Sequence, residues 1–264
     1  MSHLLVKSSA EPAGDGCVAR VTPESAGWRY VGFEVYRLVH GARLESATGG
    51  REVCAVLLSG RADVTFGGRE WAEIGRRDSV FDGVPPYAVH APPGGTLSVQ
   101  AVSEVLELAL CWAPATKGVD PVLITPEDCR VSSRGEGDTE RRIHDVLMED
   151  RPAEALLITE VLTPGGHWSS YPPHKHDTED PPLETYLEET YYHRARRPGG
   201  FAVQLVYTDD RSLDAALRVG DGDVVLVPRG YHPVGAAPGC DLYYLNVMAG
   251  PLRQWRVTVD PDFR

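Results

Sequence analysis

Residues 219–239 read VGDGDVVLVPRGYHPVGAAPG, and residues 74–94 read IGRRDSVFDGVPPYAVHAPPG. Each stretch has glycine and aspartate, then a short apolar run, a proline and a tyrosine. A short apolar run between glycine and proline turns is typical of a strand in a β-sandwich or barrel. The two stretches therefore predict two similar β units in one chain, and Ala88 stands where the second unit has His232.

The rest of the chain supports an all-β fold. Proline and glycine interrupt most windows long enough for a helix, and the apolar stretches between them are short and often alternate, among them EVCAVLLSG, LELALCWA and FAVQLVYT. Only Ser212–Leu217 and Glu140–Leu147 suit short helices. With a linker near 115–125, the 264 residues are expected to form two β-barrels, at 1–124 and 125–264.

Composition excludes several classes of protein. Lys and Arg total 26 against 38 Asp and Glu, and the net charge of −12 argues against a nucleic-acid partner. We find no apolar run long enough to span a membrane and no signal-peptide stretch near the start. Five scattered cysteines without a CxxC pair suit reduced thiols. We therefore expect a cytoplasmic protein that binds neither nucleic acid nor membrane.

Histidines are concentrated in the segment GGHWSSYPPHKHD. His174 and His176 are two residues apart, so on a strand both imidazoles project from the same face. The next predicted strand, LEETYYHR, offers Glu188 and Glu189, and the turn after a later strand offers His232. Three histidines and one carboxylate suit a divalent ion with positions left for water or substrate.

This combination resembles the two motifs of the cupins, HxH followed by a carboxylate and G-x5-P-x-G-x-H from Gly222 to His232. A narrower resemblance follows from WSSYPPHKHD, LEETYYHR, GFAVQLVYTDD, GDVVLVPRGYHPV and YYLNVMAGPLRQW. These segments look like the 5-deoxy-glucuronate isomerase family of myo-inositol catabolism, which is similar to the 5-keto-4-deoxyuronate isomerases. The resemblance covers nearly the whole chain and implies a bicupin, that is, two cupin-type β-barrels.

The resemblance also implies a ligand set for one divalent metal ion, either Zn, Mn or Fe. The implied ligands are His174, His176, Glu189 and His232. Glu188 is the rival of Glu189, and strand alternation places Glu189 on the face of Tyr191 and His193. The first half of the chain has no HxH, so we expect its barrel to bind no metal.

The reaction implied by the resemblance converts 5-deoxy-D-glucuronate to 5-dehydro-2-deoxy-D-gluconate. A divalent ion that chelates the carbonyl and the neighbouring hydroxyl stabilises the enediolate charge, and a general base moves the proton. The base stays open. The candidates for a catalytic role are Glu189, Glu188, His193, Tyr243 and Asp177, and a metal-assisted hydride shift needs no base.

The sugar-acid substrate carries a carboxylate, which arginine recognises well because its planar fork donates two parallel hydrogen bonds. The candidate arginines are Arg134, Arg142, Arg194 and Arg253. Candidates for contacts to substrate hydroxyls are Tyr171, Gln204, Tyr231 and Asn246. The remaining histidines are expected to be non-ligands, namely His3, His40, His90, His144 and His167.

Two other functions stay open at this point. Three histidines and a glutamate also suit Fe(II) and O2 chemistry, as in a cupin dioxygenase. A non-catalytic bicupin that binds a sugar acid is the second alternative. Each interpretation has a small sugar acid or similar molecule as its partner, and each leaves the oligomeric state, including a homo-oligomer, undecided.

Overall fold

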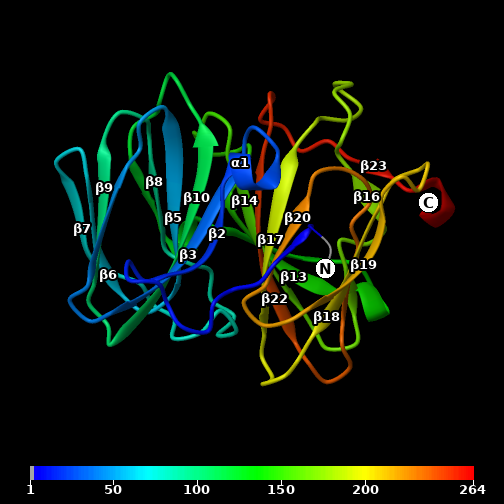
Figure 1. Cartoon of the computed structure of the whole chain (residues 1–264), viewed down its shortest axis with the longest axis horizontal. Helices are drawn as coiled ribbons and strands as arrows, with labels where there is room; N and C mark the ends of the chain where they lie inside the picture. The colour runs from blue at the N-terminus through cyan, green and yellow to red at the C-terminus, as the bar shows by residue number, and fades with distance from the viewer. Residues whose placement is uncertain (1–2) are drawn as a thin grey trace. The chain divides into compact units, whose positions relative to one another are not determined.

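The structure is a computed structural model that describes residues 3–264, and almost all of its regular elements are β-strands (Figure 1). The α-helical content of this range is one turn, α1 (Pro23–Ala26), which is capped by Thr22. Short 3-10 turns occur at Pro126–Asp128, Gly137–Thr139 and Pro261–Phe263. The predicted all-β fold is confirmed.

The described chain divides into two compact units. The N-terminal unit comprises Ser9–Arg130 and Val146–Leu156, and the C-terminal unit comprises the described residues up to Ser8, Val131–Asp145 and Leu157–Arg264. The sequence analysis places a single division between residues 124 and 125. In the structure the described residues up to Ser8 belong to the C-terminal unit, and residues 125–130 and 146–156 belong to the N-terminal unit. Strand β1 (Leu5–Val6) joins the C-terminal unit because it pairs with Val224 and Val225. The amides of residues 154–156 bind Glu52 of the N-terminal unit.

The N-terminal unit consists of two antiparallel sheets around one core. The six-stranded sheet has the order β11 (Val122–Ile124), β8 (Ala88–Ala91), β5 (Arg51–Ser59), β10 (Val105–Pro114), β3 (Gly32–Val39), β2 (Cys17–Val21). The four-stranded sheet has the order β4 (Arg43–Ala47), β9 (Thr96–Ala101), β6 (Ala62–Phe66), β7 (Arg69–Ile74). Alternate residues of each sheet, such as Val53 and Val64, are fully buried in the shared core.

The C-terminal unit contains three sheets. The seven-stranded sheet has the order β1, β20 (Val224–Val227), β17 (Glu188–Ala195), β22 (Leu242–Ala249), β14 (Leu157–Thr163), β13 (Arg141–Leu147), β12 (Arg130–Arg134). The four-stranded sheet has the order β15 (Trp168–Ser169), β21 (Val234–Ala236), β18 (Ala202–Tyr207), β19 (Asp214–Val219). Strand β16 (His174–Lys175) pairs with β23 (Thr258–Val259), near the C-terminus (Figure 1).

Both segments that the sequence analysis assigns to short helices are strands, so that prediction is wrong. Ser212–Leu217 lies largely in β19, which pairs with β18, and Glu140–Leu147 is almost entirely β13. Helices of six to eight residues are marginal by themselves, whereas a neighbouring strand supplies backbone hydrogen-bond partners and a surface to pack against. The predicted linker also contains a strand, because β11 pairs with β8.

The five cysteines are free thiols in buried positions. Within residues 3–264 we find no helix long and apolar enough to cross a membrane.

Candidate metal centre

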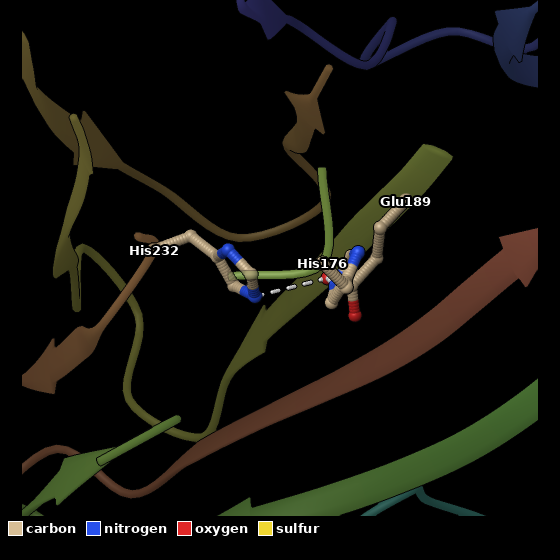
Figure 2. A group of neighbouring side chains, drawn as sticks. All are labelled: His176, Glu189 and His232. Carbon is tan, nitrogen blue, oxygen red and sulfur yellow. Dashed lines mark hydrogen bonds and ion pairs between the residues drawn. The ribbon is translucent and has the colours of Figure 1, made fainter. Parts of the chain in front are cut away.

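Three buried side chains from separate elements of the C-terminal unit converge on one point (Figure 2). Glu189 lies on β17, His176 follows β16, and His232 lies in the turn between β20 and β21. One ligand atom of each residue lies within 4.8 Å of the others. Across residues 3–264 no second group of histidine, cysteine or carboxylate ligands is this compact.

Hydrogen bonds hold both histidines with the same nitrogen toward the centre. Nδ1 of His176 donates to the Leu187 carbonyl at 3.0 Å, and Nδ1 of His232 donates to the Gly230 carbonyl at 2.8 Å. Each Nε2 then lies 3.2 Å from Oε2 of Glu189. A carbonyl partner on one ring nitrogen is the usual way in which proteins orient a metal-binding histidine.

The carboxylate of Glu189 is oriented by Asn246, whose Nδ2 donates to Oε1 at 2.7 Å. Asn246 lies on β22 directly opposite Tyr191 of β17, so both residues face the same side of the sheet as Glu189. Asn246, a candidate for contact with substrate, thus contacts a ligand candidate instead. One Glu189 oxygen is held in place by the amide, and the other faces the two imidazoles.

His174 lies beside the converging group. Its ring centroid is 5.0 Å from that of His232 and 5.8 Å from that of Trp255, both in edge-on contacts. Nδ1 of His174 faces the Pro172 carbonyl at 3.1 Å. The structure therefore brings three of the four predicted ligands together and places the fourth imidazole next to one of them.

The electrostatics of these groups fit a bound cation. Burial and the neighbouring imidazoles hold the pKa of His232 well below its usual range and that of His174 at about 4, so both rings are neutral. Burial raises the pKa of Glu189. Nε2 of His232 is buried and forms no hydrogen bond. A buried lone pair without a donor, next to a carboxylate, is the arrangement that a divalent ion satisfies.

His176 differs from the other two imidazoles. Burial lowers its pKa, but the hydrogen bond and charge of Glu189 outweigh burial and raise the pKa overall. A proton on Nε2 of His176 and a metal ion compete for the same lone pair, since metal ligands must be deprotonated.

Asp177, next to His176, is hydrogen-bonded to the turn that carries His232. Its Oδ2 accepts from the Gly230 amide at 2.8 Å, and its Oδ1 accepts from Nζ of Lys175 at 2.7 Å. Gly230 has φ +88°, and a Cβ there would lie 2.3 Å from the Tyr207 carbonyl oxygen, so this turn requires glycine. The carboxylate of Asp177 is thus engaged in holding the His232 turn, which disfavours it as the general base.

We expect Asp177→Asn to weaken metal binding by about 10-fold, because asparagine has one acceptor oxygen and cannot accept from both the Gly230 amide and Nζ of Lys175. Competition with a chromogenic chelator measures the affinity. Glu179→Gln, at an exposed position two residues away, is the matched control. Equal affinities of the Asp177 and Glu179 variants would contradict the positioning role.

The catalytic candidates are divided between two faces of the seven-stranded sheet. His193 shares the face of Glu189 and stacks on Tyr191 at 5.9 Å, with its Nε2 2.9 Å from Oε1 of Gln204. Burial lowers the pKa of His193 to about 4. Gln204, a candidate for contact with substrate, is therefore the partner of this histidine.

Glu188 and Tyr243 lie on the opposite face from Glu189, which disfavours both as groups for proton transfer at the centre. Alternation along β17 turns Glu188 away, and alternation along β22 does the same for Tyr243, next to Tyr244. The Tyr243 hydroxyl donates to Oε2 of Glu160 at 2.8 Å, and Oε1 of Glu160 lies 2.7 Å from Nδ1 of His144.

Among the arginine candidates, Arg134 lies close to the surroundings of the histidines. Its guanidinium lies 5.4 Å from the centroid of Trp255, the ring in contact with His174. Arg142 is exposed, and Arg194 pairs with Asp221 at 2.8 Å on the same face as Glu188. Arg253 is half-buried in the segment before β23.

The two tyrosine candidates lie in different surroundings. Tyr231 donates its hydroxyl to Asp209 at 2.9 Å. The ring of Tyr171 lies 6.4 Å from that of Trp168 and 5.8 Å from that of Phe263. Tyr171 thus belongs to a cluster of aromatic side chains formed by the segment before β16 and the C-terminal 3-10 turn.

Several polar residues near the centre were missed by the sequence analysis. The Ser170 hydroxyl lies 2.9 Å from the Tyr191 hydroxyl and 3.4 Å from that of Tyr244, and burial raises the pKa of both phenols. Arg141 was also missed, although it alternates with the apolar Ile143 in RRIHDVL. That alternation is the signal that would have placed Arg141 on the core side of its strand.

Comparison with known proteins adds a family and a set of relatives. Residues 4–264 match the sequence profile of the KduI/IolB family. The chain is 54% identical over 263 residues to the 5-deoxy-glucuronate isomerase of Geobacillus thermodenitrificans, covering 99% of this chain and 95% of the relative. It is 42% identical over 264 residues to the 5-deoxy-glucuronate isomerase of Bacillus subtilis, covering 99% and 97%.

Comparison with solved structures gives the same family. An IolB-like protein from Salmonella typhimurium LT2 superposes with a TM-score of 0.96 at 45% identity, covering 99% of this chain and 98% of that one. The oxalate decarboxylase of Lactobacillus farciminis superposes with a TM-score of 0.68 at 16% identity, covering 98% and 89%. The second likeness concerns the fold alone, and it supports the predicted bicupin architecture.

Proposed function

This chain belongs to the KduI/IolB family, and from that premise we propose that it is a 5-deoxy-glucuronate isomerase, which converts 5-deoxy-D-glucuronate to 5-dehydro-2-deoxy-D-gluconate. The observation that carries the proposal is the convergence of His176, Glu189 and His232 in a chain 54% identical to an isomerase of that name. In this reaction one carbon is reduced and its neighbour is oxidised within the same molecule, so the substrate and the product are isomers.

We propose that one divalent ion of the Zn, Mn or Fe type is held by His176, Glu189 and His232, with His174 as the fourth ligand. The donor set of neutral imidazoles and one carboxylate fits such an ion. When bound, the ion supplies Lewis acidity to the carbonyl and hydroxyl oxygens of the sugar. Asn246 and Asp177 keep the ligands in position.

The buried hydroxyls of Tyr191 and Tyr244 supply hydrogen-bond donors beside these ligands. Because burial raises the pKa of both phenols, they hold their protons at neutral pH and donate to substrate oxygens. Ser170 links the two hydroxyls and fixes their directions. For proton movement between the two carbons, the chain offers Glu189 and His193 on this face of the sheet.

An assay with 5-deoxy-D-glucuronate tests the function against its two alternatives. We expect the metal-loaded protein to form the ketose, detected by NMR together with loss of the aldehyde, at the same rate with and without air. Oxygen uptake in step with substrate loss would contradict the isomerase and favour the dioxygenase. Saturable binding without any turnover would favour the non-catalytic sugar-acid protein.

A further inference from the structure

Arg141 begins β13 and points to the interior of the C-terminal unit. The next residue on the same face is Ile143, which belongs to the buried core together with Tyr191 and Tyr244. Arg141 itself is half-buried, whereas its neighbour Arg142 is exposed on the other face. The strand therefore directs one arginine toward the core side and one toward solvent.

The guanidinium of Arg141 is held by backbone carbonyls. Nη1 donates to the Thr139 carbonyl at 3.0 Å, and Nη2 donates to the Tyr171 carbonyl at 2.9 Å. At Gly135 a Cβ would lie 2.7 Å from Nη1 of Arg141 and 2.2 Å from the Thr139 carbonyl oxygen. The chain around residue 135 thus leaves room for this guanidinium, which is fixed in place without using all of its five donors.

Arg141 has no carboxylate partner: within residues 3–264 no ion pair includes it. A second cation, Arg134, directly precedes Gly135, where a Cβ would lie 2.7 Å from Nη1 of Arg141, and burial lowers the pKa of Arg141. A guanidinium stays charged in proteins. A half-buried cation with a second cation nearby and no counter-ion is unfavourable unless an anion binds there.

The same cations border the metal centre. The Tyr171 carbonyl that accepts from Arg141 lies three residues before His174, and the Arg134 guanidinium lies 5.4 Å from the centroid of Trp255, whose ring contacts that of His174. Tyr191 packs in one core with Ile143, the neighbour of Arg141 on the same strand face, and its ring lies 5.7 Å from the ring of His232. An anion bound at Arg141 therefore lies beside the ligand group rather than on a remote surface.

We propose that Arg141 is the residue that binds the carboxylate of the sugar acid, while the carbonyl end of the same molecule reaches the metal centre. This inference rests on the proposed function. A uronate has its aldehyde and its carboxylate at opposite ends, so one cation beside the ligands selects acids over neutral sugars and sets which end faces the centre. Arg134, which lies over Trp255, adds positive charge at the same place.

Calorimetry with the metal-loaded protein tests the inference without requiring turnover. The probes are D-glucuronate and its uncharged amide, D-glucuronamide. We expect the unaltered protein to bind the acid at least about 10-fold more tightly than the amide, because a charge-assisted pair is lost with the amide. Arg141→Met should abolish this preference, and Arg142→Met should retain it.

Arg141→Lys serves as the second variant in case the methionine variant does not fold. Lysine keeps the charge but cannot form a bidentate pair with a carboxylate. We therefore expect the preference for D-glucuronate over D-glucuronamide to fall by about 3-fold or more. No preference in the unaltered protein, or a full preference in the Arg141 variants, would overturn the inference. Absence of isomerisation in the separate NMR assay would remove the proposed function and leave this binding result intact.

Discussion

We expect His176→Ala and His232→Ala each to abolish metal binding and to lower turnover by at least about 10³-fold, which corresponds to about 4 kcal/mol of transition-state stabilisation. The reason is that the three converging ligand atoms lie within 4.8 Å of one another, so each substitution removes a donor that no neighbour replaces. Elemental analysis of the purified variants measures the metal, and circular dichroism checks that the β fold is retained. His174→Ala is expected to act in the same direction.

Two histidine variants serve as controls for this result. His167→Ala lies in the same segment, with its Nδ1 toward the Glu140 carbonyl, and should leave metal content unchanged. His90→Ala lies in the N-terminal unit, where His90 pairs with Glu52, and should also leave metal content and turnover per folded chain unchanged. Full metal content in His176→Ala and His232→Ala would refute the ligand assignment, and metal loss in His90→Ala would indicate a second site.

We expect Glu52→Gln to lower the free energy of unfolding of the N-terminal unit by about 3–5 kcal/mol at neutral pH. The buried carboxylate of Glu52 accepts from the amides of Glu154, Ala155 and Leu156 at 2.7–2.9 Å and lies 2.9 Å from Nε2 of His90. A glutamine amide cannot accept all of these bonds and leaves buried donors unpaired. Urea unfolding followed by tryptophan fluorescence measures the loss, and the exposed Glu70→Gln is the control.

The Glu52 effect has a defined pH dependence. Burial raises the pKa of this carboxyl, but His90 and the three amides outweigh burial and lower the pKa below its ordinary value of 4.5. A depressed pKa in the folded state means that the stabilisation is fully present above pH 4.5 and is lost as the pH falls through the folded value. The difference between wild type and Glu52→Gln should therefore shrink in acid. A constant difference from pH 7 to pH 3 would contradict this account.

Much of the fold was predictable because strands have a local signature. Alternation and turn residues are properties of short stretches, so the all-β class and the two-unit repeat follow from sequence patterns alone. Strand alternation also predicts which residues of LEETYYHR share a face, and it places Glu189, Tyr191 and His193 together. HxH, the following carboxylate and His232 could be predicted as a group because their spacing within strand-and-turn motifs resembles a known family.

Other features depended on contacts between distant parts of the chain. Whether Asp214–Val219 forms a helix or a strand is decided by β18, which supplies its hydrogen-bond partners. Glu188 and Tyr243 carry suitable chemistry, but the shared pleat of β17 and β22 turns both away from Glu189. The guanidinium of Arg141 is oriented by the carbonyl of Tyr171, a residue 30 positions later in the chain.

The sequence by itself determined that this protein is an acidic, all-β chain of two similar units and that its ligand-type residues lie in the second one, because composition and period-two patterns are local. The tertiary structure alone decided which polar side chains meet. Strand pairing across many tens of residues sets each side chain on one face or the other, and a cation such as Arg141 acquires its role from neighbours that are remote in sequence.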